Sequence, residues 1–295
     1  MQAAAVAFYA SQHDQHPSVA PFIRARAAAL RDVGLTDSDI GRIEFFQFGA
    51  ATGNSIATLM WFTIHVFSDP EVVARIRGEL LPLVERRVVV TYGRSEKEAV
   101  KLNIAAVEEQ CPFFLACWKE VLRVVNVHTS VRRVLEDTWV SDGPGGAQYL
   151  LKRGQDVVIP HVIAHRYDGK AWGVGERGAV EFRPDNFLPS GDNGVDKARK
   201  AAWVPFGGGA NLCPGRRIVM VEQLAFMATL VLGFEVEALS GKGTIRPPEA
   251  MPMGLGHAIL RPAEKAEFGV RLRKRAGWEN VMWDYELGKT TKQAL

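Results

Sequence analysis

The residues with the clearest chemical potential form a glycine-rich loop that ends in a cysteine. Phe206 is followed by Gly-Gly-Gly-Ala-Asn-Leu and then by Cys213, Pro214 and Gly215, where an apolar helical pattern begins. Glycines let a backbone approach a flat cofactor more closely than a Cβ would allow. A helix N-terminus beside Cys213 favours the thiolate, which is the soft, electron-donating ligand that promotes O–O cleavage on haem iron. The loop is therefore a candidate thiolate site.

Other interpretations of this loop fit the residues less well. It lacks the Gly-Lys-Ser/Thr ending of a phosphate-binding loop, and Leu212 stands where a dinucleotide fingerprint needs its third glycine. A single cysteine in a glycine-rich turn is normally structural, and the loop alone does not decide against that simpler interpretation.

Four of these positions carry a family resemblance. Phe206, Gly209, Cys213 and Gly215 match the haem-binding signature of the cytochrome P450 family. The resemblance implies that Cys213 is the axial ligand of a haem b iron, with Phe206 packed beside it. Asn211 departs from the pattern, because the family often has a basic residue there that contacts a haem propionate.

A second element of the resemblance precedes the loop. Glu120 and Arg123 are spaced i, i+3 on a predicted helix, which by itself most often means a solvated ion pair. They resemble the family's Glu-x-x-Arg helix, whose pair binds an arginine downstream. That third position is Asn186 here, so the resemblance implies a network that keeps a hydrogen bond but loses a charge.

Two arginines lie where the family has one that pairs with a haem propionate. Arg132 and Arg133 are adjacent, and neighbouring residues of a strand point to opposite faces. We expect Arg132 to face the haem and Arg133 to face solvent.

A long helix is expected to carry the oxygen chemistry. Family monooxygenases usually have an acid followed by an alcohol there, and this chain has Gly53 and then Asn54, with Ser55 after it. This resembles the branch that includes sterol 7α- and 12α-hydroxylases and prostacyclin synthase. Asn54 could simply satisfy a helix kink, but an asparagine in an apolar helix costs free energy unless it is bonded. Asn54 and Ser55 are therefore candidate catalytic residues.

Bulk properties limit the alternatives. The chain has 295 residues, 47% of them hydrophobic, and a formal net charge of +3, which is too small to indicate nucleic acid as a partner. Its three cysteines give no disulfide framework, and Cys111 and Cys117 are interpreted as core thiols. The N-terminus has no secretory signal pattern. Residues 45–68 lack charged side chains but hold too many polar ones for a membrane span, so a helix buried in protein is expected.

Periodicity and capping signals predict the elements around the site. Helices are expected over residues 20–34, from the capping signal at 36–39 to about 65, from 70 to about 87, over 112–125, and from 214 to about 232. Short strands at 130–134, 149–151 and 156–159 should form one small sheet, and two more strands are expected near 257–260 and 268–273. Residues 165–203 should form a long meandering loop, and the tail from Lys274 is expected to be loose.

The predicted fold class is mainly α with small β-sheets, the C-terminal portion of the cytochrome P450 fold. The resemblance covers about residues 36–273. We take residues 1–273 as a truncated haem-binding domain and residues 274–295 as a polar tail. The front half of the family's domain, with its membrane anchor, has no counterpart here. We expect no anchor in this chain and a place on the cytoplasmic side, or on the endoplasmic reticulum membrane if a full-length form exists.

The resemblance implies a haem-thiolate monooxygenase that oxidises an apolar small molecule, such as a sterol, a terpenoid or a secondary metabolite. Electrons would come from NADPH–cytochrome P450 reductase, which would dock on basic residues near the thiolate, namely Lys197, Arg199, Lys200, Arg216 and Arg217. Two alternatives stay open: a peroxide isomerase or dehydratase that needs no NADPH, and a truncated remnant without catalysis. A missing N-terminal half is an expected partner.

Overall fold

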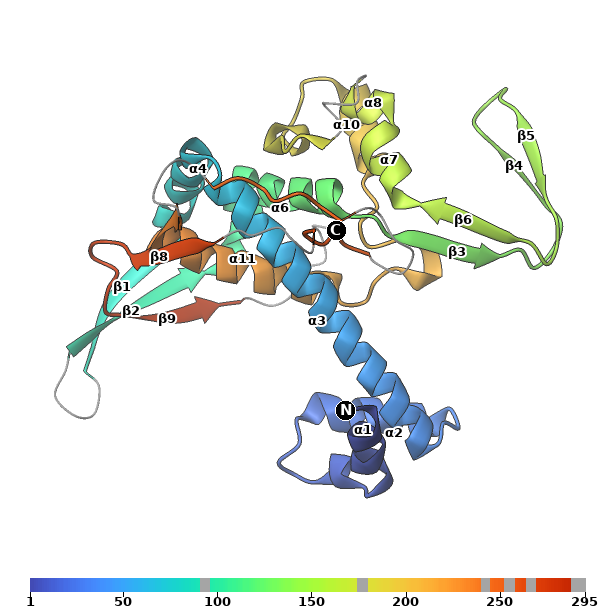
Figure 1. The fold of residues 1–295 in the computed structure, drawn as a ribbon, viewed down its shortest axis with the longest axis horizontal. Coiled ribbons are helices and arrows are strands. Elements are labelled where there is room, and N and C mark those ends of the chain that lie inside the picture. The colour runs from blue at the N-terminus through green and yellow to red at the C-terminus, as the bar shows by residue number, and fades with distance from the viewer. Residues whose placement is uncertain (91–95, 174–179, 240–244, 252–257, 264–268, 288–295) are drawn as a thin grey trace. The chain divides into compact units, whose positions relative to one another are not determined.

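The fold is described from a computed structural model. The structure describes residues 1–295 except 91–95, 174–179, 240–244, 252–257, 264–268 and 288–295. The chain divides into two compact units, unit 1 (Met1–Ile56) and unit 2 (Ala57–Leu295). Helices dominate and the sheets are small, which confirms the predicted fold class (Figure 1).

Unit 1 is a helical body built from α1 (Gln2–Ala10), α2 (Pro21–Asp32) and the first part of α3 (Asp37–Phe67). Tyr9, Ala27 and Ile40 are buried at its centre, one from each helix. The helix predicted over 20–34 is confirmed as α2, whereas α1 was not predicted.

The start of α3 follows from a capping box. The Thr36 hydroxyl accepts a hydrogen bond from the Asp39 amide at 3.2 Å, and the Thr36 amide donates to the Asp39 carboxylate at 3.3 Å. These two bonds satisfy donors that the first helical turn would otherwise leave unpaired. The predicted long helix is therefore confirmed, with its end at Phe67. Gly41 brings α3 against α1, since a Cβ there would lie 2.5 Å from the Val6 Cα.

Unit 2 holds the main core. Its helices and 3-10 turns are the end of α3, α4 (Pro70–Leu80), η2 (Leu81–Leu83), η3 (Ile104–Ala106), α5 (Val107–Gln110), α6 (Pro112–Val125), α7 (His161–Tyr167), α8 (Gly169–Trp172), η4 (Pro184–Phe187), α10 (Asn193–Ala202), η5 (Gly209–Asn211) and α11 (Arg216–Gly233). The predicted helices over 112–125 and from 214 are confirmed as α6 and α11.

The centre of this core lies between α6 and α11, which run side by side in Figure 1. The Trp118 indole of α6 donates to the Gln223 side-chain oxygen of α11 at 2.8 Å, and both side chains are buried. A buried indole N–H needs such a partner, because an unpaired one would cost free energy. Glu79 caps the start of α6, where its carboxylate accepts from the Phe113 and Phe114 amides.

Small sheets surround the helices. The strands are β1 (Val84–Val90), β2 (Glu96–Asn103), β3 (Thr129–Arg133), β4 (Thr138–Ser141), β5 (Gln148–Leu151), β6 (Asp156–Pro160), β7 (Phe234–Ala238), β8 (Val270–Lys274) and β9 (Val281–Glu286). The first sheet has the order β1-β2-β9, with β1–β2 antiparallel and β2–β9 parallel. The others are the antiparallel pairs β3–β6, β4–β5 and β7–β8.

Two predictions about strands need correction. The strands predicted at 130–134, 149–151 and 156–159 exist, but they belong to two separate sheets, because β5 pairs with β4 and not with β3 or β6. Near 257–260 the structure has an isolated bridge between Asn126 and Ile259 and no strand in the described residues. His257 itself lies outside the described residues.

Three further expectations are wrong in part. The helix from residue 70 ends at Leu80, because Pro82 lacks an amide donor and the following valine-rich run forms β1. The expected loop over 165–203 contains short helices, including α10. Beyond Lys274 the chain is not loose throughout, because Trp278 is buried and β9 pairs with β2.

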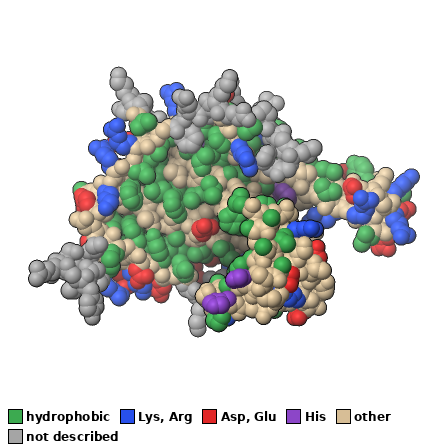
Figure 2. Space-filling model, turned by 60° about the horizontal axis from the view of Figure 1, so that its bottom comes forward, with side chains coloured by type: hydrophobic (Ala, Val, Ile, Leu, Met, Phe, Trp, Pro, Cys, Tyr) green, Lys and Arg blue, Asp and Glu red, His purple; other side chains and the backbone are tan. Residues whose placement is uncertain are grey.

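The helix over residues 45–68 is buried only in its second part. Trp61 and Phe62 belong to the core of unit 2, whereas Phe46, Phe48 and Ile56 are exposed. Among the described helices, none combines the length and hydropathy that crossing a membrane requires. Figure 2 shows many hydrophobic side chains on one face of unit 2, and exposed apolar residues of this unit include Ile218 and Phe226. Large exposed apolar patches are typical of interaction surfaces.

Candidate functional site

The cysteine loop is a closed turn whose ends are joined by a backbone hydrogen bond. The Cys213 amide donates to the Phe206 carbonyl at 3.0 Å, and the Gly207 amide donates to the Val204 carbonyl at 3.1 Å. Gly207 and Gly209 have φ values of 76° and 65°, in the left-handed region that glycine adopts without steric cost. The glycines therefore shape the turn that presents Cys213.

Cys213 differs from the other two cysteines in its environment. It is half-buried at the entrance to α11, and its carbonyl accepts from the Arg216 guanidinium at 2.9 Å. Burial raises the pKa of Cys111 to about 12 and holds that of Cys117 well above its usual range. Those two buried thiols cannot readily ionise, which confirms them as core groups. Cys213 is the cysteine that a ligand can reach.

Aromatic side chains support the start of the loop. The Phe206 ring stacks on Trp118 at 6.0 Å between centroids and meets Trp203 edge-on at 6.4 Å. Gly215 lies close to the sulfur, since a Cβ there would be 3.9 Å from the Cys213 Sγ. The resemblance-based positions Phe206, Gly209, Cys213 and Gly215 thus come together in one turn.

Two buried polar side chains hold the residues just before Phe206. The Asn126 amide donates to the Pro205 carbonyl at 2.9 Å, and the Val204 amide donates to the His165 Nε2 at 3.0 Å. Asn126 and His165 are almost completely buried. Sequence reasoning missed both; the one available signal was a polar residue inside the apolar run that follows Arg123.

Glu120 and Arg123 form a buried ion pair. Both side chains have no exposed surface, and the Arg123 guanidinium donates two bonds of 2.7 Å to the Glu120 carboxylate. Arg123 also donates to the His165 carbonyl at 2.8 Å, so the pair connects to the residue that holds Val204. Burial raises the pKa of Glu120, and the Arg123 charge opposes that shift.

Asn186 takes the third position of this network. Its side-chain amide donates to Glu120 Oε1 at 3.1 Å, and the Arg183 backbone amide donates to the same oxygen at 2.8 Å. The structure therefore shows the retained hydrogen bond that the sequence suggested for Asn186. A neutral amide also leaves Arg123 as the cation that balances Glu120.

Arg132 and Arg133 point in different directions. Arg132 donates to the Gly208 carbonyl of the cysteine loop at 3.3 Å. Arg133 pairs with the exposed Asp156 of the neighbouring strand. Arg132 therefore lies beside the cysteine loop and Arg133 beside Asp156, and the role expected for Arg132 at a haem stays a prediction.

A row of histidines lies between the β3–β6 sheet and α7. The His161 Nε2 is 2.9 Å from the Ser130 hydroxyl, and the His128 and His161 ring centroids are 4.9 Å apart. Burial lowers the pKa of His161 to about 4 and that of His165 to about 3. Burial therefore favours the neutral form of His161 and His165. The His65 ring stacks with Trp61 and with Phe182, and burial lowers its pKa to about 4.

Asn54 and Ser55 lie in the last turn of unit 1, on α3, whereas Cys213 belongs to unit 2. Asn54 is exposed and Ser55 is half-buried. A Cβ at Gly53 would meet open space, so the missing acid at that position has no steric cause within the described residues.

The chemistry of this turn fits a haem on its cysteine side. Cys213 offers a sulfur ligand, Arg132 reaches the loop from the neighbouring sheet, and a positive-φ glycine turn separates Phe206 from Cys213. In the part of the chain that the structure describes, no cluster of histidine, cysteine and carboxylate groups could hold a separate metal ion. A single thiolate suits an iron whose other ligands come from a porphyrin.

Comparison with known proteins places this geometry in a family. The family sequence model described as Cytochrome P450 matches residues 9–269. A cytochrome P450 monooxygenase of Gibberella zeae is 36% identical over 93% of this chain and 51% of its own length. Cytochrome P450 monooxygenase nodJ of Hypoxylon pulicicidum is 29% identical over 86% of this chain and 47% of its own. The human 7-alpha-hydroxycholest-4-en-3-one 12-alpha-hydroxylase is 24% identical over 82% of this chain and 47% of its own length.

The chain spans about half the length of the curated relatives it matches. The family model nevertheless covers most of this chain, from α1 to the residue before β8. The match includes the cysteine loop, the buried Glu120–Arg123 pair and α3. The chain therefore belongs to the cytochrome P450 family, whose cofactor is a haem with a cysteine thiolate on its iron.

Proposed function

We propose that this chain is the C-terminal part of a haem-thiolate monooxygenase that oxidises an apolar small molecule with O2 and electrons from a reductase. The observation that carries the proposal is the turn from Phe206 to Cys213. It presents a half-buried sulfur before α11. The two residues that precede Phe206 are held by buried hydrogen bonds to Asn126, which follows α6, and to His165 of α7. The relatives' names, which include monooxygenases, support the same activity.

Cys213 would be the iron ligand in this proposal. The start of α11 next to it favours the negative charge of a thiolate. Phe206 would shield one side of the sulfur, and Gly209 and Gly215 would leave room for the porphyrin to approach the backbone. When bound, the haem would supply oxygen activation, and these residues would hold it and keep water from the sulfur.

Arg132 would bind a haem propionate. Its guanidinium already lies beside the loop, where it donates to the Gly208 carbonyl at 3.3 Å, a long contact that a carboxylate would replace at little cost. Arg133 would take no part, because it pairs with Asp156.

Asn54 and Ser55 would position oxygen or substrate and hold protons during the reaction. Gly53 stands at the family's acid position, so no carboxylate is available there as a relay. An amide and a hydroxyl can each donate and accept hydrogen bonds, which suits them to order water molecules as a substitute.

The substrate class is inferred from the relatives. Their names include steroid and cholestane hydroxylases as well as cytochrome P450 monooxygenases. We infer an apolar substrate such as a sterol, a terpenoid or another secondary metabolite. The electron donor would be NADPH–cytochrome P450 reductase. Its docking surface would be the basic group of Lys197, Arg199, Lys200, Arg216 and Arg217.

The haem pocket would be completed by the part of the family's domain that precedes the matched region. The exposed apolar side chains of unit 2, such as Ile218 and Phe226, support a surface that another part of the fold covers. This part would be supplied by the same polypeptide or by a second one, on the endoplasmic reticulum membrane if it carries an anchor.

The test is the spectrum of the purified protein after haem loading, reduction and exposure to CO. We expect the long-wavelength Soret band of a thiolate-ligated haem, and its loss in Cys213→Ser, while Cys117→Ser keeps it. A wild-type protein that gives no such band, alone or with the preceding half of the domain added, would rule out the proposal.

Gly53 also favours a second candidate, an isomerase or dehydratase that rearranges a peroxide on the same haem. That reaction needs neither the proton-relay acid nor a reductase. Turnover of an organic hydroperoxide in the absence of NADPH would favour it. Strict dependence of turnover on reductase and NADPH would exclude it and support the monooxygenase.

A further inference from the structure

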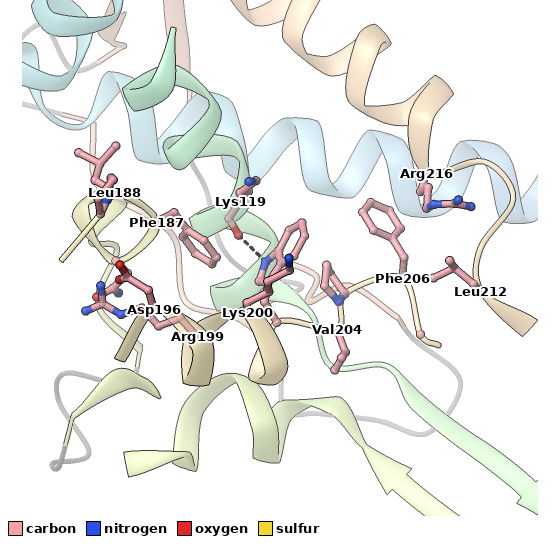
Figure 3. A pocket seen from close by; sticks show the side chains of 15 residues that line it. Lys119, Phe187, Leu188, Asp196, Arg199, Lys200, Val204, Phe206, Leu212 and Arg216 are labelled. Carbon is pink, nitrogen blue, oxygen red and sulfur yellow. Dashed lines mark hydrogen bonds between the residues drawn. The ribbon is translucent and has the colours of Figure 1, made fainter. Parts of the chain in front are cut away.

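A cleft of about 590 Å3 lies in unit 2, next to the cysteine loop but on the side of α6 and α10 (Figure 3). Small-molecule sites in proteins commonly measure roughly 300 to 1,000 Å3. In the close-up, Phe187 and Leu188 lie at one end of the cleft, and Phe206 and Leu212 lie at the other. With Trp203, these side chains give the cleft an elongated, largely apolar lining.

Four cations also line the cleft. They are Lys119 of α6, Arg199 and Lys200 of α10, and Arg216 of α11. The carboxylate on its wall belongs to Asp196, which already accepts hydrogen bonds from the Ser190 amide. The cleft therefore has an excess of positive charge over an apolar lining.

None of the four cations forms an ion pair with a carboxylate among the described residues. Arg199 donates to the Ala171 carbonyl at 3.1 Å and Arg216 to the Cys213 carbonyl at 2.9 Å, and neutral carbonyls do not cancel their charge. The Lys119 ammonium lies 5.7 Å from the centre of the Trp203 ring, and burial lowers its pKa. A partly buried cation of this kind is stabilised by an incoming anion.

We propose that this cleft binds an amphipathic anion of the long-chain carboxylate class. The acyl chain would lie along Phe187, Trp203 and Phe206, and the carboxylate would pair with Lys119 and Lys200. Burial of the chain against aromatic rings supplies the attraction, and the cations determine the preference for an anion over an alcohol of the same length. Cys213 does not line the cleft, and the cleft shares Arg199, Lys200 and Arg216 with the proposed reductase-docking surface.

The experiment is equilibrium dialysis of radiolabelled laurate, below its micellar concentration, against the full chain. We expect saturable binding of one laurate per chain that weakens as salt is added, and clearly weaker binding of dodecanol. Lys200→Glu reverses one charge of the cleft and should weaken laurate binding about tenfold. Lys119→Gln should weaken it less, because it removes a charge without introducing an opposing one.

Lys197→Glu is the matched control. Lys197 lies on the same helix as Lys200 and is exposed, but it does not line the cleft. Its reversal should leave laurate binding unchanged. Circular dichroism of each variant checks that the fold is retained, and Lys200→Gln, a milder change, tests the same contact if Lys200→Glu unfolds.

Several outcomes would overturn the proposal. They are absence of saturable laurate binding, equal binding by the wild type and Lys200→Glu, and equal weakening by Lys200→Glu and Lys197→Glu. Binding of an acidic peptide such as hexaglutamate in place of laurate would assign the cleft to a protein partner instead. The CO spectrum of the same samples keeps the two proposals apart: laurate binding without the thiolate band contradicts the proposed function alone, and the converse contradicts the cleft alone.

Discussion

The cysteine loop and the part of α3 around Asn54 and Ser55 both carry residues proposed for oxygen chemistry. The two regions are held in place by different kinds of contact. In the loop region, Val204 and Pro205 are bonded to His165 and Asn126, which are buried in the core of unit 2. Around Asn54, the backbone is an ordinary helix whose own hydrogen bonds hold it. The loop therefore depends on tertiary contacts, and the α3 stretch depends mainly on local ones.

Removing the buried acid should produce the largest effect. Glu120→Ala leaves the Arg123 guanidinium buried without its counter-charge, and such a loss costs about 3 to 5 kcal/mol. We expect a large drop in the urea midpoint of unfolding. Glu181→Ala is the control, because this exposed carboxylate pairs with exposed Arg183 and should contribute about 1 kcal/mol or less. Similar midpoints for the two variants would contradict a structural role for the buried pair.

The second-largest effect is expected on acidification, which should destabilise the region that holds the cysteine loop. The pKa of His165 is lowered to about 3 and that of His161 to about 4, both below the ordinary value of 6.5. Their contribution to stability is complete above pH 6.5 and is lost as the pH falls towards those values. As the pH falls through that range, each of these histidines should lower the free energy of unfolding by about 1.4 kcal/mol per pH unit.

The measurement is the free energy of unfolding at several pH values between 7 and 4.5, for the wild type and for His165→Gln. Glutamine retains a side-chain acceptor for the Val204 amide but does not titrate in this range. We expect a shallower pH dependence for the variant. Parallel curves for the two proteins would show that His165 is not held in its neutral form.

Loss of Asn126 should have a smaller effect. Asn126→Ala leaves the Pro205 carbonyl and the His128 amide without their partners in a buried place, which costs about 1 to 3 kcal/mol. We also expect faster hydrogen exchange in residues 204–213. Asn211→Ala, in the exposed part of the same loop, is the control and should change stability by less than about 0.5 kcal/mol. If the two variants have equal stability, the contacts of Asn126 do not hold the loop.

The smallest effect on stability is expected on α3. Asn54→Ala changes an exposed helical residue, and alanine favours a helix, so the free energy of unfolding should change by less than about 0.5 kcal/mol. Reductase-dependent turnover should nevertheless fall if Asn54 positions oxygen. Unchanged stability with unchanged turnover would remove Asn54 from the catalytic residues and leave the cysteine loop as the supported part of the site.

Local signals were sufficient where a short segment determines its own structure. The capping box at Thr36 and Asp39 predicted the start of α3, and the i, i+3 spacing of Glu120 and Arg123 predicted their pairing. They were insufficient after Leu80, where a helix was expected but β1 forms. The strand is favoured there by its place in a sheet with β2 and β9, and β9 lies far from it in sequence.

The sequence by itself indicated a thiolate site at the cysteine loop, through the resemblance of Phe206, Gly209, Cys213 and Gly215 to the family's haem-binding signature. It also indicated that Asn186 could replace a charge with a hydrogen bond. Only the tertiary structure decided which side chains hold that loop, since Asn126 and His165 are separated from it by about 40 or more residues. It also decided that the Glu120–Arg123 pair is buried, because burial depends on how α6 packs within unit 2 and not on the spacing of two residues.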